Sequence, residues 1–255
     1  IHMPRKLKVA FSNGADDSVH SAFRDMGFMA NPDGTFTLRI AGGLGGGYKM
    51  GILVDEHVQT TEILYYIRAM IETFCQHGNY ENRAKARTRF MQETLGTDGL
   101  KEAFLENVAK VKEKGGLDLH VEAKPVTKKG SGEISGKRVV AQKQPGLYAV
   151  AYHPIGGCLP AGKPAELLTL VREIPDAECR IAPHETIYII NLTADEAKKV
   201  LEATNDGAQS TFENSVACIG AAICQQGVRD SQALLHRLIE MEREEGFEDG
   251  ILPQI

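Results

Sequence analysis

Two cysteines six positions apart, in a segment rich in glycine, constrain this chain more than any other feature of its sequence. Cys218 and Cys224 lie in ACIGAAICQQG, residues 217–227. On a regular helix these positions are about 600° apart, or roughly 120° around the axis, so the two sulfur atoms would not converge. We therefore expect a bend, for which Gly220 and Gly227 provide the conformational freedom. Thiolates brought together in this way suit an iron–sulfur cluster or another soft-metal site. The alternative is two ordinary buried thiols.

Length and charge restrict the class of protein. With 255 residues, the chain has room for one large domain or two to three smaller ones. A formal net charge of −5 argues against a protein that coats nucleic acid. No apolar run approaches the roughly 18 to 20 residues that span a bilayer, and no apolar secretory core is present. We expect a cytoplasmic protein. Its five scattered cysteines indicate reduced thiols or metal ligands, not a disulfide framework.

The first part of the chain alternates short strands with turn signals. Residues 7–11 predict a strand that ends at the turn residues 12–14. Asp16 or Asp17 is expected to cap a short helix that reaches Met26. Residues 28–30 and 35–40 predict a hairpin whose connection, NPDG, is a strong turn signal.

A glycine-rich loop follows the predicted hairpin. Residues 42–47 hold five glycines in six positions, which lets the backbone approach an anionic or planar ligand closely. The loop fits neither the dinucleotide fingerprint nor the phosphate-binding P-loop. A flexible surface loop is the alternative.

Three helices are expected next. Residues 59–77 carry apolar side chains at helical spacing, and residues 99–114 repeat that pattern. Between them, residues 82–90 predict a helix on which Arg83 and Arg87 share a face. Its four cations in seven residues could line a site for carboxylates or oxyanions, although such runs also form solvated helix faces.

The second part of the chain has the plan of a small α+β unit. Residues 115–143 are expected to form a linker, because they are rich in Lys, Gly, Ser and Thr and lack helical periodicity. The order strand 147–152, helix 164–172, strand 185–191 and a helix from Thr193 or Asn191 through residue 203 is half of a ferredoxin-like plan. An amphipathic helix over 231–245 and an apolar, strand-like tail at 251–255 end the chain.

Several motifs together resemble the assimilatory nitrite and sulfite reductases, which carry siroheme and a 4Fe-4S cluster. They are PRKLKVA at 4–10, DMGF at 25–28, GGLG at 42–45, RAKARTRF at 83–90 and the cysteine segment, in that family's order and at about its spacing. The resemblance implies an α+β fold. It implies a nitrite/sulfite reductase 4Fe-4S-type domain at 4–114 and, beyond the linker, a second ferredoxin-like half-domain at 144–213. Residues 214–255 would begin a second 4Fe-4S domain.

The resemblance also assigns roles. Lys6 and Lys8 would hold the anionic substrate, sulfite or nitrite, against its own charge while electrons and protons arrive. Arg87, and less directly Arg83, would meet the siroheme carboxylates, with Gly43 and Gly45 in the adjoining loop. Cys218 and Cys224 match the first two cluster ligands. The implied reaction is the six-electron reduction of sulfite to sulfide or nitrite to ammonia.

The departures from the family are as informative as the matches. The family uses four cysteines, and Cys75, Cys158 and Cys179 have neither the spacing nor the neighbours of the second pair. The family's first ferredoxin-like half is also missing. We therefore expect a fragment that alone lacks siroheme and reductase activity, that would receive electrons from a donor protein or domain when intact, and that self-associates as a homodimer through its ferredoxin-like half.

Two other classes of function remain open. A non-redox module that binds an anion or tetrapyrrole needs only Lys6, Lys8, Arg83 and Arg87. A zinc-dependent structural protein would combine Cys218 and Cys224 with two further ligands, for which His153 and His184 are the candidates. The sequence does not choose between sulfite and nitrite.

Overall fold

The computed structural model describes residues 1–14, 17–122 and 125–255, which fall into two compact units. Unit 1 is Ile1–Ala123 and unit 2 is Lys124–Ile255. Each unit has its own sheet and its own hydrophobic core. The expected α+β fold class is confirmed.

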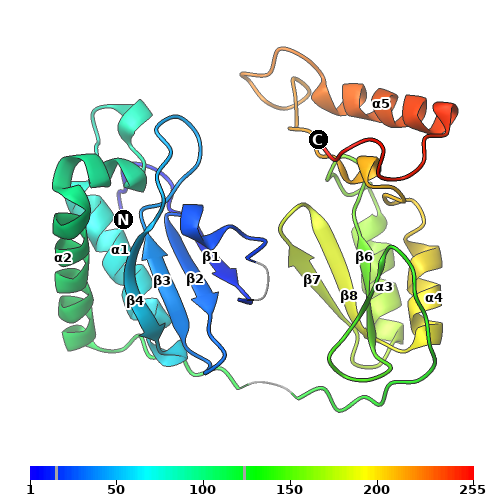
Figure 1. The fold of residues 1–255 in the computed structure, drawn as a ribbon, viewed down its shortest axis with the longest axis horizontal. Coiled ribbons are helices and arrows are strands. Elements are labelled where there is room, and N and C mark those ends of the chain that lie inside the picture. The colour runs from blue at the N-terminus through cyan, green and yellow to red at the C-terminus, as the bar shows by residue number, and fades with distance from the viewer. Residues whose placement is uncertain (15–16, 123–124) are drawn as a thin grey trace. The chain divides into compact units, whose positions relative to one another are not determined.

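Unit 1 is built on a four-stranded mixed sheet in the order β1-β2-β3-β4 (Figure 1). The strands are β1 (Val9–Ser12), β2 (Met26–Ala30), β3 (Phe36–Ile40) and β4 (Ile52–Val58). β1 runs parallel to β2, and the other two pairs are antiparallel. The predicted hairpin is confirmed as β2 and β3, with Gly34 at a φ of 86° in its turn. β4 was not expected from the sequence.

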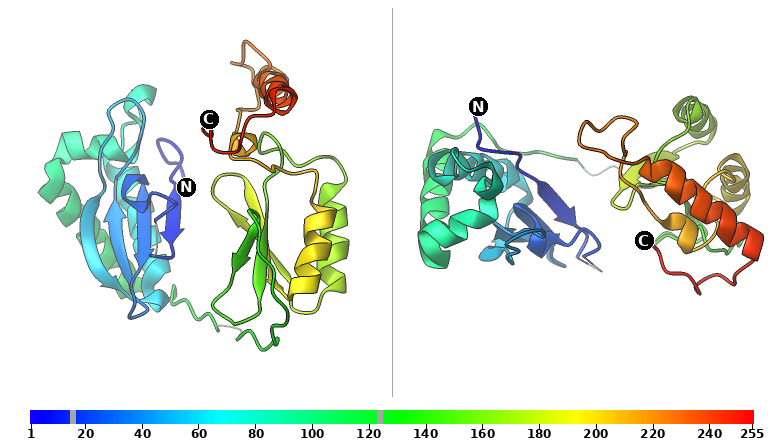
Figure 2. Two further views of the ribbon diagram at one scale, coloured as in Figure 1. Left: turned by 45° about the vertical axis from the view of Figure 1, so that its right-hand side comes forward. Right: turned by 90° about the horizontal axis from the view of Figure 1, so that it is seen from above.

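Two helices cover one face of this sheet (Figures 1 and 2). They are α1 (Ile63–His77) and α2 (Met91–Lys114). Their apolar stripes bury Met70, Phe74 and Phe104 against Phe28 and Leu38 of the sheet, and all five side chains are fully inaccessible. α2 is interrupted at Gly96, whose φ of 72° and ψ of 173° are not helical. α1 and the part of α2 after Gly96 confirm the two long helices predicted in this part of the chain.

The helix predicted over residues 82–90 is wrong. That segment forms two single 3₁₀ turns, Arg83–Lys85 and Thr88–Phe90, and Arg87 between them is extended, with φ −107° and ψ 151°. The short helix expected before Met26 is likewise one 3₁₀ turn, Ser21–Phe23. Asp17 accepts hydrogen bonds from the Ser21 N–H, whereas the other proposed cap, Asp16, lies outside the described residues.

Unit 2 has a second four-stranded sheet, in the order β5-β6-β8-β7 and antiparallel throughout. The strands are β5 (Val139–Ala141), β6 (Tyr148–Tyr152), β7 (Glu178–Ala182) and β8 (Thr186–Leu192). α3 (Lys163–Glu173) and α4 (Ala194–Ala203) pack on one face. The sequence β6-α3-β7-β8-α4 is the expected ferredoxin-like half. α4 begins at Thr193 with a reciprocal capping box to Glu196, as predicted.

Residues 115–143, expected to form a linker, are held at several points. Leu119 donates its backbone N–H to Thr61 in unit 1. In unit 2, Lys128 pairs with Glu196 at 2.7 Å, Ser131 is bonded to Gly146, and β5 adds an edge strand beside β6.

The C-terminal part of unit 2 holds α5 (Ser231–Glu245), which is confirmed where it was predicted. α5 packs Leu235 and Ile239 against Phe212 in a small separate core. The apolar tail at 251–255 forms no strand, so that prediction is wrong. Among the described residues, no helix is both long and apolar enough to cross a membrane.

Candidate functional site

A small basic hollow in unit 1 gathers side chains from the parts of the chain that the motifs singled out. Its volume is about 120 Å³. It lies where the start of β1, the turn before β2, the loop after β3 and the segment before α2 meet. The residues that line it are Lys8, His20, Phe23, Arg24, Asp25, Gly43, Leu44, Arg87 and Arg89. Four of these nine side chains are permanent or near-permanent cations, so the hollow favours an anion.

Arg87 is held in this hollow by a buried ion pair. Its Nη2 atom lies 2.6 Å from Asp25 Oδ2, and the Asp25 side chain is 1% exposed. Thr88 donates its hydroxyl to the other oxygen of the same carboxylate. The Nε atom of Arg87 is buried and has no hydrogen-bond partner in the structure. A buried N–H group without a partner is uncommon in a folded protein, so the Nε–H of Arg87 could still donate to a polar partner that the described residues do not supply.

The surroundings of Lys8 lower its pKa. Partial burial and the nearby charges of Lys6, Arg87 and Arg24 lower the pKa of Lys8, while the Asp25 carboxylate opposes that change. An ammonium with a lowered pKa both attracts an anion and releases a proton more readily than an ordinary lysine.

Arg89 fixes the glycine loop that borders the hollow. Its Nε and Nη2 atoms donate to the carbonyls of Gly47 and Gly46 at 3.0 and 2.8 Å. The guanidinium also lies 4.7 Å from the centroid of the Phe90 ring. A Cβ atom on Gly43 would lie 3.0 Å from Arg89 Cδ, so a side chain there would push against the arginine, and glycine favours the close approach of loop and arginine. The loop is bound at this point and not free, unlike the flexible surface loop of the alternative hypothesis.

The predicted site residues of unit 1 are thus placed in two groups. Lys8, Arg87 and Gly43 line the hollow together. Lys6 is exposed and close enough to influence Lys8, and Gly45 has a φ of 102° in the loop. Arg83 does not line the hollow. It is exposed, and its carbonyl accepts a hydrogen bond from Arg5, because the helix that would have aligned it with Arg87 does not form.

Sequence reasoning missed four polar residues of the hollow, namely His20, Arg24, Asp25 and Arg89, as well as the apolar Phe23 and Leu44. Asp25 and Arg89 fall inside motifs that were recognised, so a signal was present. A carboxylate directly before a buried strand, and an alternating run of four cations after a helix, were the patterns that could have identified them.

The cysteine segment of unit 2 bends as expected. Gly220 has a φ of 64°, and its carbonyl accepts the N–H of Cys224 at 2.9 Å. Cys218 and Cys224 are both exposed, so the alternative of two buried thiols is wrong. The Ser231 hydroxyl, together with the Gly220 N–H, lowers the pKa of Cys218 and so favours its thiolate. That is the form in which a cysteine binds a metal.

The zinc hypothesis gains no support from the described residues, which contain no group of three or more His, Cys, Asp or Glu side chains able to hold a metal ion. His153 is 4% exposed, and its Nδ1 atom lies 3.2 Å from the Thr186 hydroxyl. Burial lowers the pKa of His153, so its neutral form is favoured in the core of unit 2.

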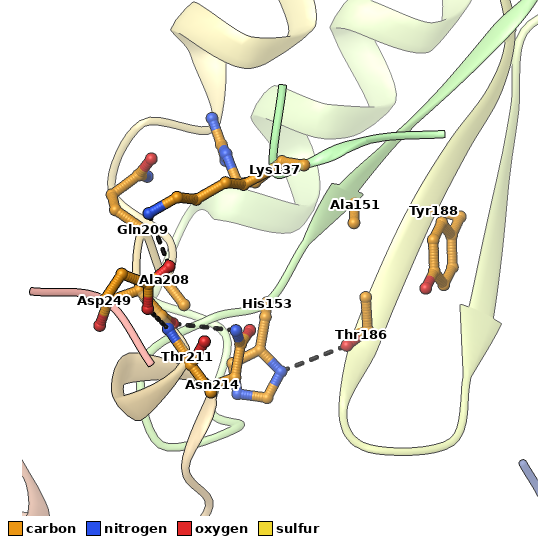
Figure 3. A pocket seen from close by; sticks show the side chains of 12 residues that line it. Lys137, Ala151, His153, Thr186, Tyr188, Ala208, Gln209, Thr211, Asn214 and Asp249 are labelled. Atoms are coloured by element: carbon orange, nitrogen blue, oxygen red, sulfur yellow. Dashed lines mark hydrogen bonds and ion pairs between the residues drawn. The ribbon is translucent and has the colours of Figure 1, made fainter. Parts of the chain in front are cut away.

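Unit 2 has a larger hollow of about 390 Å³ beside His153 (Figure 3). Its two basic residues are already engaged. Lys137 pairs with Asp249 at 2.6 Å, and Arg138 donates to the carbonyls of Leu201 and Thr204. This hollow therefore lacks the excess of positive charge that distinguishes the hollow of unit 1.

Comparison with known proteins gives one matching family. Residues 2–112 match the model of the "Nitrite and sulphite reductase 4Fe-4S domain". The chain is 26% identical over 245 residues to a chloroplastic ferredoxin–nitrite reductase of Arabidopsis thaliana, covering 91% of this chain and 40% of that protein. It is 24% identical over 271 residues to the NADPH sulfite reductase hemoprotein beta-component of Geobacillus kaustophilus, covering 98% of this chain and 45% of that protein.

A solved structure shows the same fold. The Mycobacterium tuberculosis NirA protein superimposes with a TM-score of 0.72 at 23% identity, over 99% of this chain and 46% of that one. The chain thus spans less than half the length of the relatives it matches.

The contact between Arg89 and the glycine loop gives a matched pair of variants. We expect Gly43→Ala to displace Arg89 and weaken its bonds to the loop, each worth about 1.5 to 3 kcal/mol for a charged donor. The Lys49 N–H, which donates to Gly43, should then exchange roughly tenfold faster with deuterium. Gly46→Ala is the control, since nothing lies within 4 Å of its Cβ position. Equal exchange rates in the two variants would contradict the assignment.

Proposed function

This chain is related to the nitrite and sulfite reductases through residues 2–112, which match their 4Fe-4S domain, and we propose that it contributes to the siroheme- and 4Fe-4S-dependent reduction of nitrite to ammonia or sulfite to sulfide. The observation that carries this proposal is the basic hollow in which Lys8 and Arg87 meet beside the glycine loop. Because the chain spans less than half of its relatives, the six-electron reaction is proposed for the whole protein.

The residues of unit 1 fit part of a siroheme site. The unpaired, buried Nε–H of Arg87 suits a carboxylate of an anionic tetrapyrrole, and Gly43 lets the loop lie close to the ligand. When bound, siroheme supplies the iron on which the oxyanion is reduced. Lys8 and Lys6, both exposed, are proposed to hold that oxyanion, and Lys8, with its lowered pKa, to donate a proton from Nζ to a departing oxygen.

The residues of unit 2 fit a 4Fe-4S cluster less completely than the residues of unit 1 fit siroheme. Cys218 and Cys224 are exposed and lie in a bent segment, and the lowered pKa of Cys218 favours its thiolate. These properties suit two ligands of a 4Fe-4S cluster. The cluster needs four such ligands, and the described residues offer no group of three.

The second candidate function is a non-redox module that binds an anion or a tetrapyrrole. It is favoured by one observation, namely that the hollow is complete within unit 1 and needs no residue of the cysteine segment. Iron and acid-labile sulfide in the purified chain would favour the reductase, whereas bound tetrapyrrole without either would favour the binding module.

Anion binding by the isolated chain tests the hollow directly. We expect sodium nitrite and sodium sulfite to shift the NMR signals of Lys8, Gly43 and Arg87, and Lys8→Ala to weaken binding about three- to tenfold because one charge-assisted hydrogen bond is lost. Lys110→Ala, an exposed lysine on α2 paired with Glu106, is the control. If both variants bind like the wild type, Lys8 does not hold the anion.

We also expect the chain by itself to show neither siroheme absorbance nor reductase activity. The reason is the incomplete set of thiolate ligands among the described residues. The measurement is a visible spectrum together with assays for sulfide and ammonia with a chemical electron donor. Tetrapyrrole absorbance accompanied by either product would refute this expectation.

The ferredoxin-like sheet of unit 2 is proposed to pair with a second copy. Ile181 on the edge strand β7 is 87% exposed, and Val140 on the opposite edge strand is 49% exposed. Light scattering should therefore detect a dimer, and Ile181→Lys should dissociate it, whereas Leu168→Lys on α3 should not. A wild-type sample that contains only the 27.8 kDa species would contradict the dimer.

A further inference from the structure

Asp25 is the most enclosed charged residue of the unit 1 hollow, and three segments depend on it. Its Oδ2 atom accepts the backbone N–H of Lys8 at 2.8 Å and Arg87 Nη2 at 2.6 Å. Its Oδ1 atom accepts the hydroxyl of Thr88. One carboxylate therefore links the start of β1 to the segment before α2, which lies more than 60 residues further along the chain.

The main chain at the same position reinforces these links. The Asp25 carbonyl accepts the N–H of Ala41, the residue that precedes the glycine loop, at 2.8 Å. The Met26 N–H donates to the Lys8 carbonyl at 3.0 Å, so both backbone groups of Lys8 are held by residues 25 and 26. The three walls that carry Lys8, Arg87 and Gly43 are thus all attached to one residue.

The charge of Asp25 and its hydrogen bonds have opposite effects on an anion in the hollow. Asp25 is the only carboxylate among the nine described residues that line it, and its charge partly cancels those of Lys8, Arg24, Arg87 and Arg89. By charge alone, its removal would make the hollow more positive and strengthen anion binding. Its removal would also release Arg87 and the backbone of Lys8, so these two donors would no longer be aligned and anion binding would weaken.

We propose that Asp25 is the positioning residue of the anion site, and that the alignment it imposes outweighs the repulsion of its charge. It fixes the Arg87 guanidinium through Nη2 while leaving Nε–H unpaired, and it fixes the backbone of Lys8, the residue that precedes β1. This inference rests on the proposed function of the hollow. The direction of the affinity change distinguishes it from a purely electrostatic role, and the Arg87 Nε signal of the folded, ligand-free variant distinguishes it from a loss of folding.

The test compares sulfite binding by the full wild-type chain and by Asp25→Asn, followed by NMR titration. We expect binding to become about tenfold weaker, equivalent to about 1.4 kcal/mol, although the variant has one negative charge fewer. The Arg87 Nε signal should also move in the variant without ligand. Unchanged or tighter binding by a folded Asp25→Asn chain would overturn the inference.

Two further variants keep the test decisive. Thr88→Val removes one hydrogen bond to Asp25 without changing any charge, and we expect it to bind sulfite about threefold more weakly than the wild type. This variant tests the inference even when Asp25→Asn does not fold. Unaltered binding by Thr88→Val would then overturn the inference.

Glu213→Gln is the matched control. It removes a buried carboxylate of unit 2 that lies 2.6 Å from Arg243, and it should leave binding unchanged. A wild-type chain that binds no sulfite overturns the proposed function and this inference together, whereas binding that is insensitive to Asp25 and Thr88 overturns the inference alone.

Discussion

The arrangement of the candidate site depends on the buried ion pair between Asp25 and Arg87. A buried pair is a poor source of net stability, because removing both groups from water costs about as much as their attraction returns. What such a pair supplies is a defined geometry, since either partner alone would be an uncompensated buried charge. In this protein the geometry lets four cationic side chains surround one small hollow without separating under their mutual repulsion. Partial burial, together with this crowding of positive charge, lowers the pKa of Lys8.

Much of the fold could be predicted from local pattern. The helices α1 and α5 are confirmed because their apolar stripes recur at helical spacing, and α4 because Thr193 and Glu196 form the capping box that the sequence indicates. β4 was not identified although Ile52, Val54 and Val58 are buried, and β7 was not identified because it is an exposed edge strand without apolar alternation. The helix expected at 82–90 fails because Asn82 accepts the Ala84 N–H, which favours a short turn, and because Arg87 is extended toward Asp25.

The site was predictable in part for a different reason. Lys8, Arg87 and Gly43 were assigned from a family resemblance in motif order, and the structure brings these three together. Asp25, Arg24 and Arg89 were missed because their roles arise from tertiary contacts across tens of residues, such as the bonds of Arg89 to Gly46 and Gly47. Periodicity and spacing carry no information about contacts of that kind. Arg83 was expected to share a face with Arg87, and it does not line the hollow because the helix on which that expectation depended is not formed.

The position of β5 affects the order in which unit 2 can assemble. In the usual ferredoxin-like topology, the strand beside the first one comes last in the chain and must return across the whole domain. Here that place is taken by a strand from upstream, and Val139 pairs with Val150 across a short connection. Closing a short loop costs little conformational entropy, and contacts that are local in sequence form quickly. Pairing β6 with β5 therefore needs no strand from the far end of the domain.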